Sequence, residues 1–279
     1  MQKMLPGSAG SKQKTIRKNS NSPMNLDEIG ESLAFDTAFW LEGANNPEHP
    51  FEEMGSICLD LAEKFRSLAI ICLLAKGNCD LFYHHLIRAG QTWKKYLERV
   101  HHEQAFEDHH FCSARFEPLL DAIVALDLTL ARYIVKLSPR EFREGHEYED
   151  DYCYAQILAR WIAEPAQDQD VPPLLERFAA YIEHQPNARL ALCRALADRD
   201  QGAFDDAFAD SLLARDLEIE AAKERGQLEE PHVIAERRVF VEGLAILRLA
   251  ERRGLRTERE YRYCPWLARV PMRTPFPGE

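Results

Sequence analysis

The stretch that decides the fold of this chain is MGSICLDLAEKFRSLAIIC, residues 54–72. Its apolar side chains recur every three or four residues, which places them along one face of an α-helix. That face consists of Met54, Ile57, Leu61, Phe65, Leu68 and Cys72. The same spacing returns in residues 82–100 and 116–134, so residues 54–72 are expected to be the first of several amphipathic helices.

Further helices are predicted towards the C-terminus. We expect a helix over about residues 148–163 and a helical hairpin over residues 187–225. A last long helix is predicted from Pro231 to Gly254. Its middle, residues 239–250, is apolar on nearly every side, which is typical of a helix in the centre of a bundle.

These patterns predict an all-α fold, because no segment shows the sustained alternation of apolar and polar residues that a strand requires. We expect about nine or ten helices, packed as a bundle of antiparallel hairpins without a sheet, in a single domain over residues 25–279. Residues 1–24 hold five Lys and Arg residues, no acid and no periodicity. They are expected to be a disordered basic tail or an artefact of an upstream start.

The charge of the chain points to a basic partner. The net charge is −11, and the five cations of the tail leave −16 on residues 25–279. An acidic body repels nucleic acid and anionic membranes and attracts basic proteins, so neither nucleic acid nor membrane is expected as a partner. The seven cysteines are scattered without a C-x-x-C pair, which favours free thiols in a reducing cytoplasm.

Residues 141–151, EFREGHEYEDD, form the most unusual local motif, because six of these eleven residues are acidic. The motif leads directly into the helix expected over residues 148–163. At 100° per residue, Tyr148 and Tyr152 face the core, whereas Glu149, with Gln156, points into water. Asp151 falls within the apolar arc. It is therefore expected to be a structural carboxylate, partly buried and paired with an arginine such as Arg115 or Arg132.

The remaining acids of this motif are candidates for contact with a partner, since an acidic and aromatic surface suits a basic protein. The predicted partner-binding residues are Glu144, Glu147, Glu149, Asp150 and Tyr154, with a second acidic set at Asp205, Asp206 and Asp210. The alternative for the acids of the first turn is purely structural, because they also stabilise the helix dipole.

Three histidine pairs raise the question of a metal site. They are His84-His85, His101-His102 and His109-His110, with acids between the last two pairs. Adjacent histidines on a helix diverge by about 100°, and no H-x-x-x-H spacing occurs. We therefore expect no metal and no cofactor, and keep an all-α metalloenzyme as the less favoured alternative.

Catalytic motifs are missing from the sequence. There is no G-x-S-x-G, no Gly-rich phosphate loop and no zinc-protease pattern. Cys153 lies near a helix N-terminus, where the pKa of its thiol could fall, but no histidine is forced close to it by the sequence. We therefore expect no catalytic residue and no enzymatic activity.

Two segments, EYEDDYCY at 147–154 and FVEGLAILRLAERRG at 240–254, resemble the immunity protein 49 family. That family comprises all-α antitoxins encoded beside toxins of bacterial polymorphic toxin and secretion systems, which act in interbacterial competition. The immunity proteins of polymorphic nucleases look similar. The resemblance implies that the chain binds and neutralises a cognate toxin effector inside the producing cell, and it carries over no catalytic residue.

Together these observations predict a cytoplasmic immunity protein that binds a basic, nuclease-type toxin through an acidic helical surface. The alternative is a helical adaptor of tetratricopeptide type, because residues 187–226 have the small and large rhythm of such hairpins. A homodimer stays open as a further association.

Overall fold

The computed structural model describes residues 25–46, 48–164, 166–228 and 231–277, so the tail predicted for residues 1–24 lies outside the described residues. Within these ranges the chain forms eleven α-helices and two short 3-10 helices, η1 and η2. No strand occurs in the described part, where an isolated bridge joins Tyr261 and Cys264. The predicted all-α class is confirmed, with one helix more than the nine or ten expected.

The first helices are α1 (Leu26–Asn45), α2 (Phe51–Lys76), α3 (Cys79–Glu103), α4 (Glu117–Val124) and α5 (Leu128–Leu137). They are followed by α6 (Glu149–Ile162), η1 (Asp168–Asp170), α7 (Val171–Tyr181), α8 (Ala188–Asp198) and α9 (Gln201–Glu224). The last elements are α10 (Pro231–Glu236), α11 (Val241–Arg252) and η2 (Trp266–Arg269).

The helices α2 and α3 form the longest hairpin, and its turn follows from two residues. Gly77 adopts a left-handed conformation with φ of 58°, and its N–H donates to the Leu73 carbonyl, which ends α2. The Asn78 side chain then accepts a hydrogen bond of 2.9 Å from the Leu81 N–H and starts α3. The apolar face predicted for residues 54–72 is buried in this hairpin.

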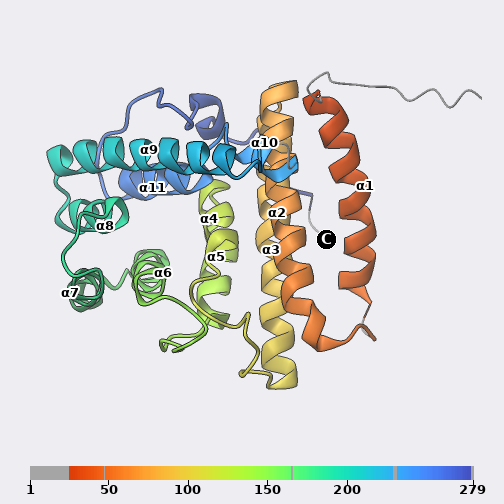
Figure 1. Ribbon diagram of the computed structural model, residues 1–279, viewed down its shortest axis with the longest axis horizontal. Coiled ribbons are helices and arrows are strands. Elements are labelled where there is room, and N and C mark those ends of the chain that lie inside the picture. The colour runs from red at the N-terminus through yellow and green to blue at the C-terminus, as the bar shows by residue number, and fades with distance from the viewer. Residues whose placement is uncertain (1–24, 47, 165, 229–230, 278–279) are drawn as a thin grey trace, which may run out of the picture.

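Figure 1 shows how the helices are arranged around that hairpin. Helix α1 packs beside α2, and α4 and α5 pack on α3. Helices α6, α7 and α8 follow one another at the other end of the molecule, while α9 pairs with α8 in the predicted hairpin. The apolar helix α11 packs against α4 and is buried over most of its length, as its sequence predicts.

The single helix expected from Pro231 to Gly254 is wrong, because α10 and α11 are separate. The backbone is extended at Phe240, with φ of −93° and ψ of 92°. Its N–H donates to the Tyr263 carbonyl at 2.8 Å, so a residue far along the chain takes the hydrogen bond that a continuous helix would use. None of the described helices is both long enough and apolar enough to cross a bilayer.

A buried ion pair joins α2 to α4. The Arg66 guanidinium donates two hydrogen bonds of 2.8 Å to the two carboxylate oxygens of Asp121, which is completely buried. A second carboxylate, that of Glu236 on α10, lies 3.5 Å from the same guanidinium. Because each charge compensates the desolvation of the other, neither can be removed alone without leaving a buried charge.

We predict that Asp121→Ala lowers the free energy of unfolding by about 3–5 kcal/mol, because Arg66 loses its bidentate partner. The double variant Arg66→Met/Asp121→Leu should be clearly more stable than Asp121→Ala, since it buries no unpaired charge. Urea denaturation of the three proteins measures both effects. A double variant no more stable than the single one would contradict this account of the pair.

Candidate functional site

The acidic motif at residues 141–151 forms the loop before α6 and the first turn of that helix. The Glu147 carboxylate lies half-buried and accepts hydrogen bonds from the N–H groups of Ala114 (2.8 Å) and Arg143 (3.0 Å). Burial raises the pKa of the Glu147 carboxyl, and these backbone donors oppose the rise. The hydrogen bond from Ala114 joins the loop to the segment that precedes α4, and the one from Arg143 lies within the loop.

Glu149 also has a partner within the fold. Its carboxylate lies 2.5 Å from the Arg177 guanidinium of α7, which is also placed over the Tyr152 ring at 4.9 Å. Glu149 is half-buried and Gln156 is only 4% exposed, so the prediction that this face of α6 points into water is wrong. Tyr148, expected in the core, is instead 71% exposed. Both α5 and α7 pack against α6, whereas the helical projection assigned only one side of this helix to the core.

Asp151 lies half-buried, as the sequence predicts, but its partner is neither Arg115 nor Arg132. Its carboxylate accepts a hydrogen bond of 2.9 Å from Arg189 on α8. Burial raises the pKa of the Asp151 carboxyl, and the Arg189 charge opposes this rise. Arg132 pairs instead with Glu164 at 2.5 Å. The partner is 38 residues away along the chain, beyond the reach of a helical projection.

Arg189 connects three helices, α6, α8 and α11, with the residue that precedes α4. It donates two further hydrogen bonds, of 2.7 and 2.8 Å, to Glu242 on α11. Its guanidinium also lies over the rings of Phe116 (5.4 Å) and Tyr154 (5.0 Å). Tyr154 is fully buried beneath these groups, which corrects the prediction that its ring faces a partner.

Beside Arg189 the surface is hollowed into two adjoining recesses of about 190 and 630 Å³. Both are lined by Phe116, Glu117 and Arg189, and together we call them the acidic groove. Its other lining residues are Arg66, Ala114, Arg115, Leu120, Gly145–Tyr148, Asp151, Arg215, Glu218, Glu236 and Val239–Glu242.

Glu117 stands out among the charges of the acidic groove. Arg66, Arg189 and Arg215 each pair with a carboxylate, whereas Glu117 and the exposed Arg115 have no ion-pair partner in the described part of the chain. The residue is exposed, yet desolvation of the carboxyl by the groove around it raises its pKa, with the Arg66 charge opposing the rise. Sequence analysis missed Glu117, because a single acid before a proline in a first helical turn is an ordinary helix start.

Two acids of the predicted set, Glu144 and Asp150, are neighbours in sequence of Gly145 and Asp151, which line the groove. Glu144 is exposed, and Asp150 is half-buried without an ion-pair partner among the described residues. The second predicted set, Asp205, Asp206 and Asp210, is exposed on α9, where Asp205 accepts a hydrogen bond of 2.9 Å from Gln201. The two sets therefore belong to different elements of the fold.

The histidine pairs are spread over separate contacts. The Nε2 atoms of His84 and His101 lie 3.0 and 2.8 Å from the carbonyl oxygens of Thr274 and Leu137. Across the described ranges, no three His, Cys, Asp or Glu side chains gather in a way that could hold a metal ion.

Burial raises the pKa of the Cys153 thiol to about 11, so the prediction that its position near a helix N-terminus could lower this pKa is wrong.

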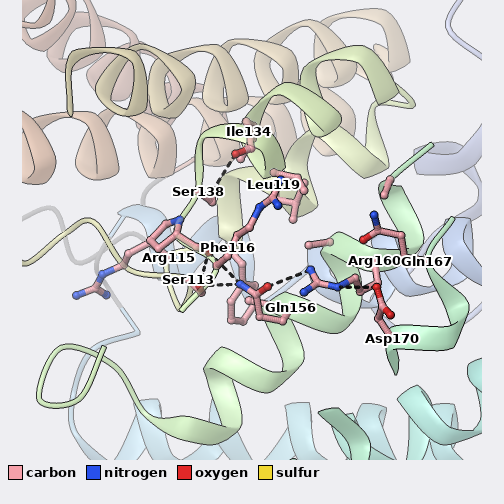
Figure 2. A pocket seen from close by; sticks show the side chains of 16 residues that line it. Ser113, Arg115, Phe116, Leu119, Ile134, Ser138, Gln156, Arg160, Gln167 and Asp170 are labelled. Carbon is pink, nitrogen blue, oxygen red and sulfur yellow. Dashed lines mark hydrogen bonds and ion pairs between the residues drawn. The ribbon is translucent and has the colours of Figure 1, made fainter. Parts of the chain in front are cut away.

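A separate cavity of about 260 Å³ lies against α6, between α5 and η1. Figure 2 shows Gln156, Arg160 and Asp170 in sequence along one wall, with the Arg115 side chain directed away from them. The lining residues are Ser113, Arg115, Phe116, Leu119, Ile134, Val135, Ser138–Arg140, Ala155, Gln156, Ala159, Arg160, Ala163, Gln167 and Asp170.

Comparison with known protein families gives a match that covers most of the chain. A family model described as Immunity protein 49 matches residues 70–266. The chain therefore belongs to the immunity protein 49 family, as the motifs at 147–154 and 240–254 indicate. No curated protein and no solved structure matches the chain.

The geometry predicts different effects for two acids of the same motif. Asp151→Ala should lower the free energy of unfolding by roughly 1–2 kcal/mol, because it removes a partly buried partner of Arg189. Glu144→Ala should change it by no more than about 0.5 kcal/mol, since the exposed Glu144 side chain makes no ion pair among the described residues. Thermal or urea unfolding of the two variants checks this, and equal stability would contradict the structural role of Asp151.

Proposed function

We propose that this chain is an antitoxin that acts in the cytoplasm, where it binds and neutralises a cognate toxin effector through the acidic groove and its edge. The observation that carries the proposal is the unpaired Glu117 carboxylate in that groove, in a chain that belongs to an immunity protein family. A cationic side chain of a partner could pair with Glu117 without displacing an existing ion pair.

The charge of the body supports a basic toxin of nuclease type. A nuclease presents lysine and arginine side chains to phosphates, and these same groups are attracted by an acidic surface. Such complementarity accelerates association and discriminates between partners. A protein bound over the phosphate-binding residues blocks access of nucleic acid, so neutralisation requires no chemistry by this chain.

The groove is prepared for such a partner by the contacts beneath it. The carboxylates of Glu147, Asp151 and Glu242 are held by hydrogen bonds from backbone N–H groups or from Arg189. These contacts fix the walls before a partner arrives, which reduces the entropy lost on binding. The unpaired acids, Glu117, Glu144 and Asp150, then supply the charge that faces the partner.

Co-expression tests the proposed function directly. The product of the neighbouring gene, expressed alone in a sensitive host, should stop growth, and co-expression of this chain should restore it. A harmless neighbour, or a toxic neighbour that this chain does not neutralise, would contradict the assignment as its antitoxin.

Charge reversal tests the position of the binding surface. The triple variant Glu117→Lys/Glu144→Lys/Asp150→Lys should bind the toxin at least about a hundredfold more weakly, because several close charge pairs become repulsive. The matched control is Asp205→Lys/Asp206→Lys/Asp210→Lys, which changes the net charge equally on α9. Calorimetric titration at two salt concentrations measures both affinities, with circular dichroism to show that the variants are folded.

The control separates a local effect from a general one. Equal weakening in both variants would mean that only the net charge matters. Weakening in the α9 variant alone would place the toxin on Asp205, Asp206 and Asp210, and would contradict the groove as the binding surface.

A further inference from the structure

The cavity of Figure 2 differs from the rest of the surface in its charge. Arg140 and Arg160 line it, together with Arg115, whose side chain is directed away from Arg160, and Asp170 is the one acid among its lining residues. A positive recess is unexpected on a body whose net charge is strongly negative. Neither the acidic groove nor the proposed attraction of a basic toxin accounts for it.

The hydrogen bonds of Gln156 fix one wall of this cavity. Gln156 is 4% exposed, and its Nε2 donates hydrogen bonds of 3.0 Å to the Ser113 hydroxyl and to the Pro139 carbonyl. Both N–H groups of the amide are therefore used, so its Oε1 is turned towards Arg160 and accepts a hydrogen bond of 3.1 Å from Nη1. The Arg160 guanidinium is thus held in place without a ligand.

Arg160 keeps unused capacity for hydrogen bonds. A guanidinium has five N–H donors, and one of those on Arg160 Nη1 is used in the hydrogen bond to Gln156. Its Nε is buried and has no hydrogen-bond partner among the described residues, and the nearest acid, Asp170, lies 3.9 Å away, too far for a hydrogen bond. Arg140 is exposed and, within the described ranges, its side chain makes no ion pair.

The rest of the lining is apolar and limits the kind of anion that fits. Phe116, Leu119 and Ile134 are buried residues that line the cavity, together with Ala155 and Ala159 of α6. A ligand therefore needs a short apolar body beside its charged group. Asp170 next to Arg160 disfavours a dianion, whereas a planar carboxylate matches the fork of a guanidinium.

We propose that this cavity binds a monocarboxylate with a short aliphatic body, with its carboxylate on Arg160 and Arg140 and its carbon chain against Leu119 and Ile134. Either a free carboxylic acid or a Glu side chain of a bound protein offers this chemistry. The proposal does not rest on the proposed antitoxin function, because the cavity is formed by this chain alone.

Titration of the full chain with sodium hexanoate, followed by NMR, tests the proposal. Hexanoate should bind in the millimolar range and shift the side-chain N–H signals of Gln156 and Arg160. Hexanamide, of the same shape but uncharged, should bind at least about tenfold more weakly, since it lacks the charge-assisted hydrogen bonds. Arg140→Gln should weaken hexanoate about tenfold or more while leaving the fold intact, because Arg140 is exposed.

Three results would overturn the proposal: no shift with hexanoate, equal binding of hexanamide, or stronger binding of inorganic phosphate than of hexanoate. Given hexanoate binding, the source of the carboxylate is decided by a competition experiment. Displacement of the bound toxin by hexanoate would identify a side chain of the partner, and simultaneous binding of both would identify a free acid.

Discussion

The Arg189 side chain is the contact on which the organisation of this molecule depends most. It lies on α8 and holds Asp151 of α6 and Glu242 of α11, while its guanidinium covers Phe116 and Tyr154. A partly buried guanidinium is stable only with such partners, since desolvation of a charge must be compensated. One residue thereby joins three of the helices that line the acidic groove and fixes the positions of the Asp151 and Glu242 carboxylates.

This contact divides the acids of the site into two kinds. Asp151, Glu242 and Glu147 are engaged by Arg189 or by the backbone, and they maintain the shape of the groove. Glu117, Glu144 and Asp150 have no ion-pair partner in the described part of the chain, so their charge is available to another molecule. For a member of the immunity protein 49 family, this arrangement is the physical basis of the recognition of a basic toxin that we propose.

The sequence predicted the elements that depend on local spacing and failed where distant residues decide. The apolar face of residues 54–72, the hairpin of α8 and α9 and the burial of α11 follow from periodicity and turn residues. The break at Phe240 depends on Tyr263, and the partner of Asp151 is Arg189, neither of which a local pattern contains. Tyr154 was misplaced because α6 is covered on more than one side. The unpaired state of Glu117 could not be predicted, because it depends on which neighbouring cations are already paired.

Hydrogen–deuterium exchange of this chain with and without its cognate toxin tests the central claim, that the partner binds at the acidic groove, most directly. The account predicts slower exchange in the toxin complex at residues 114–117 and 144–151, with little change at residues 201–210 of α9. Protection confined to α9, or to α1 at the opposite end of the fold, would contradict it.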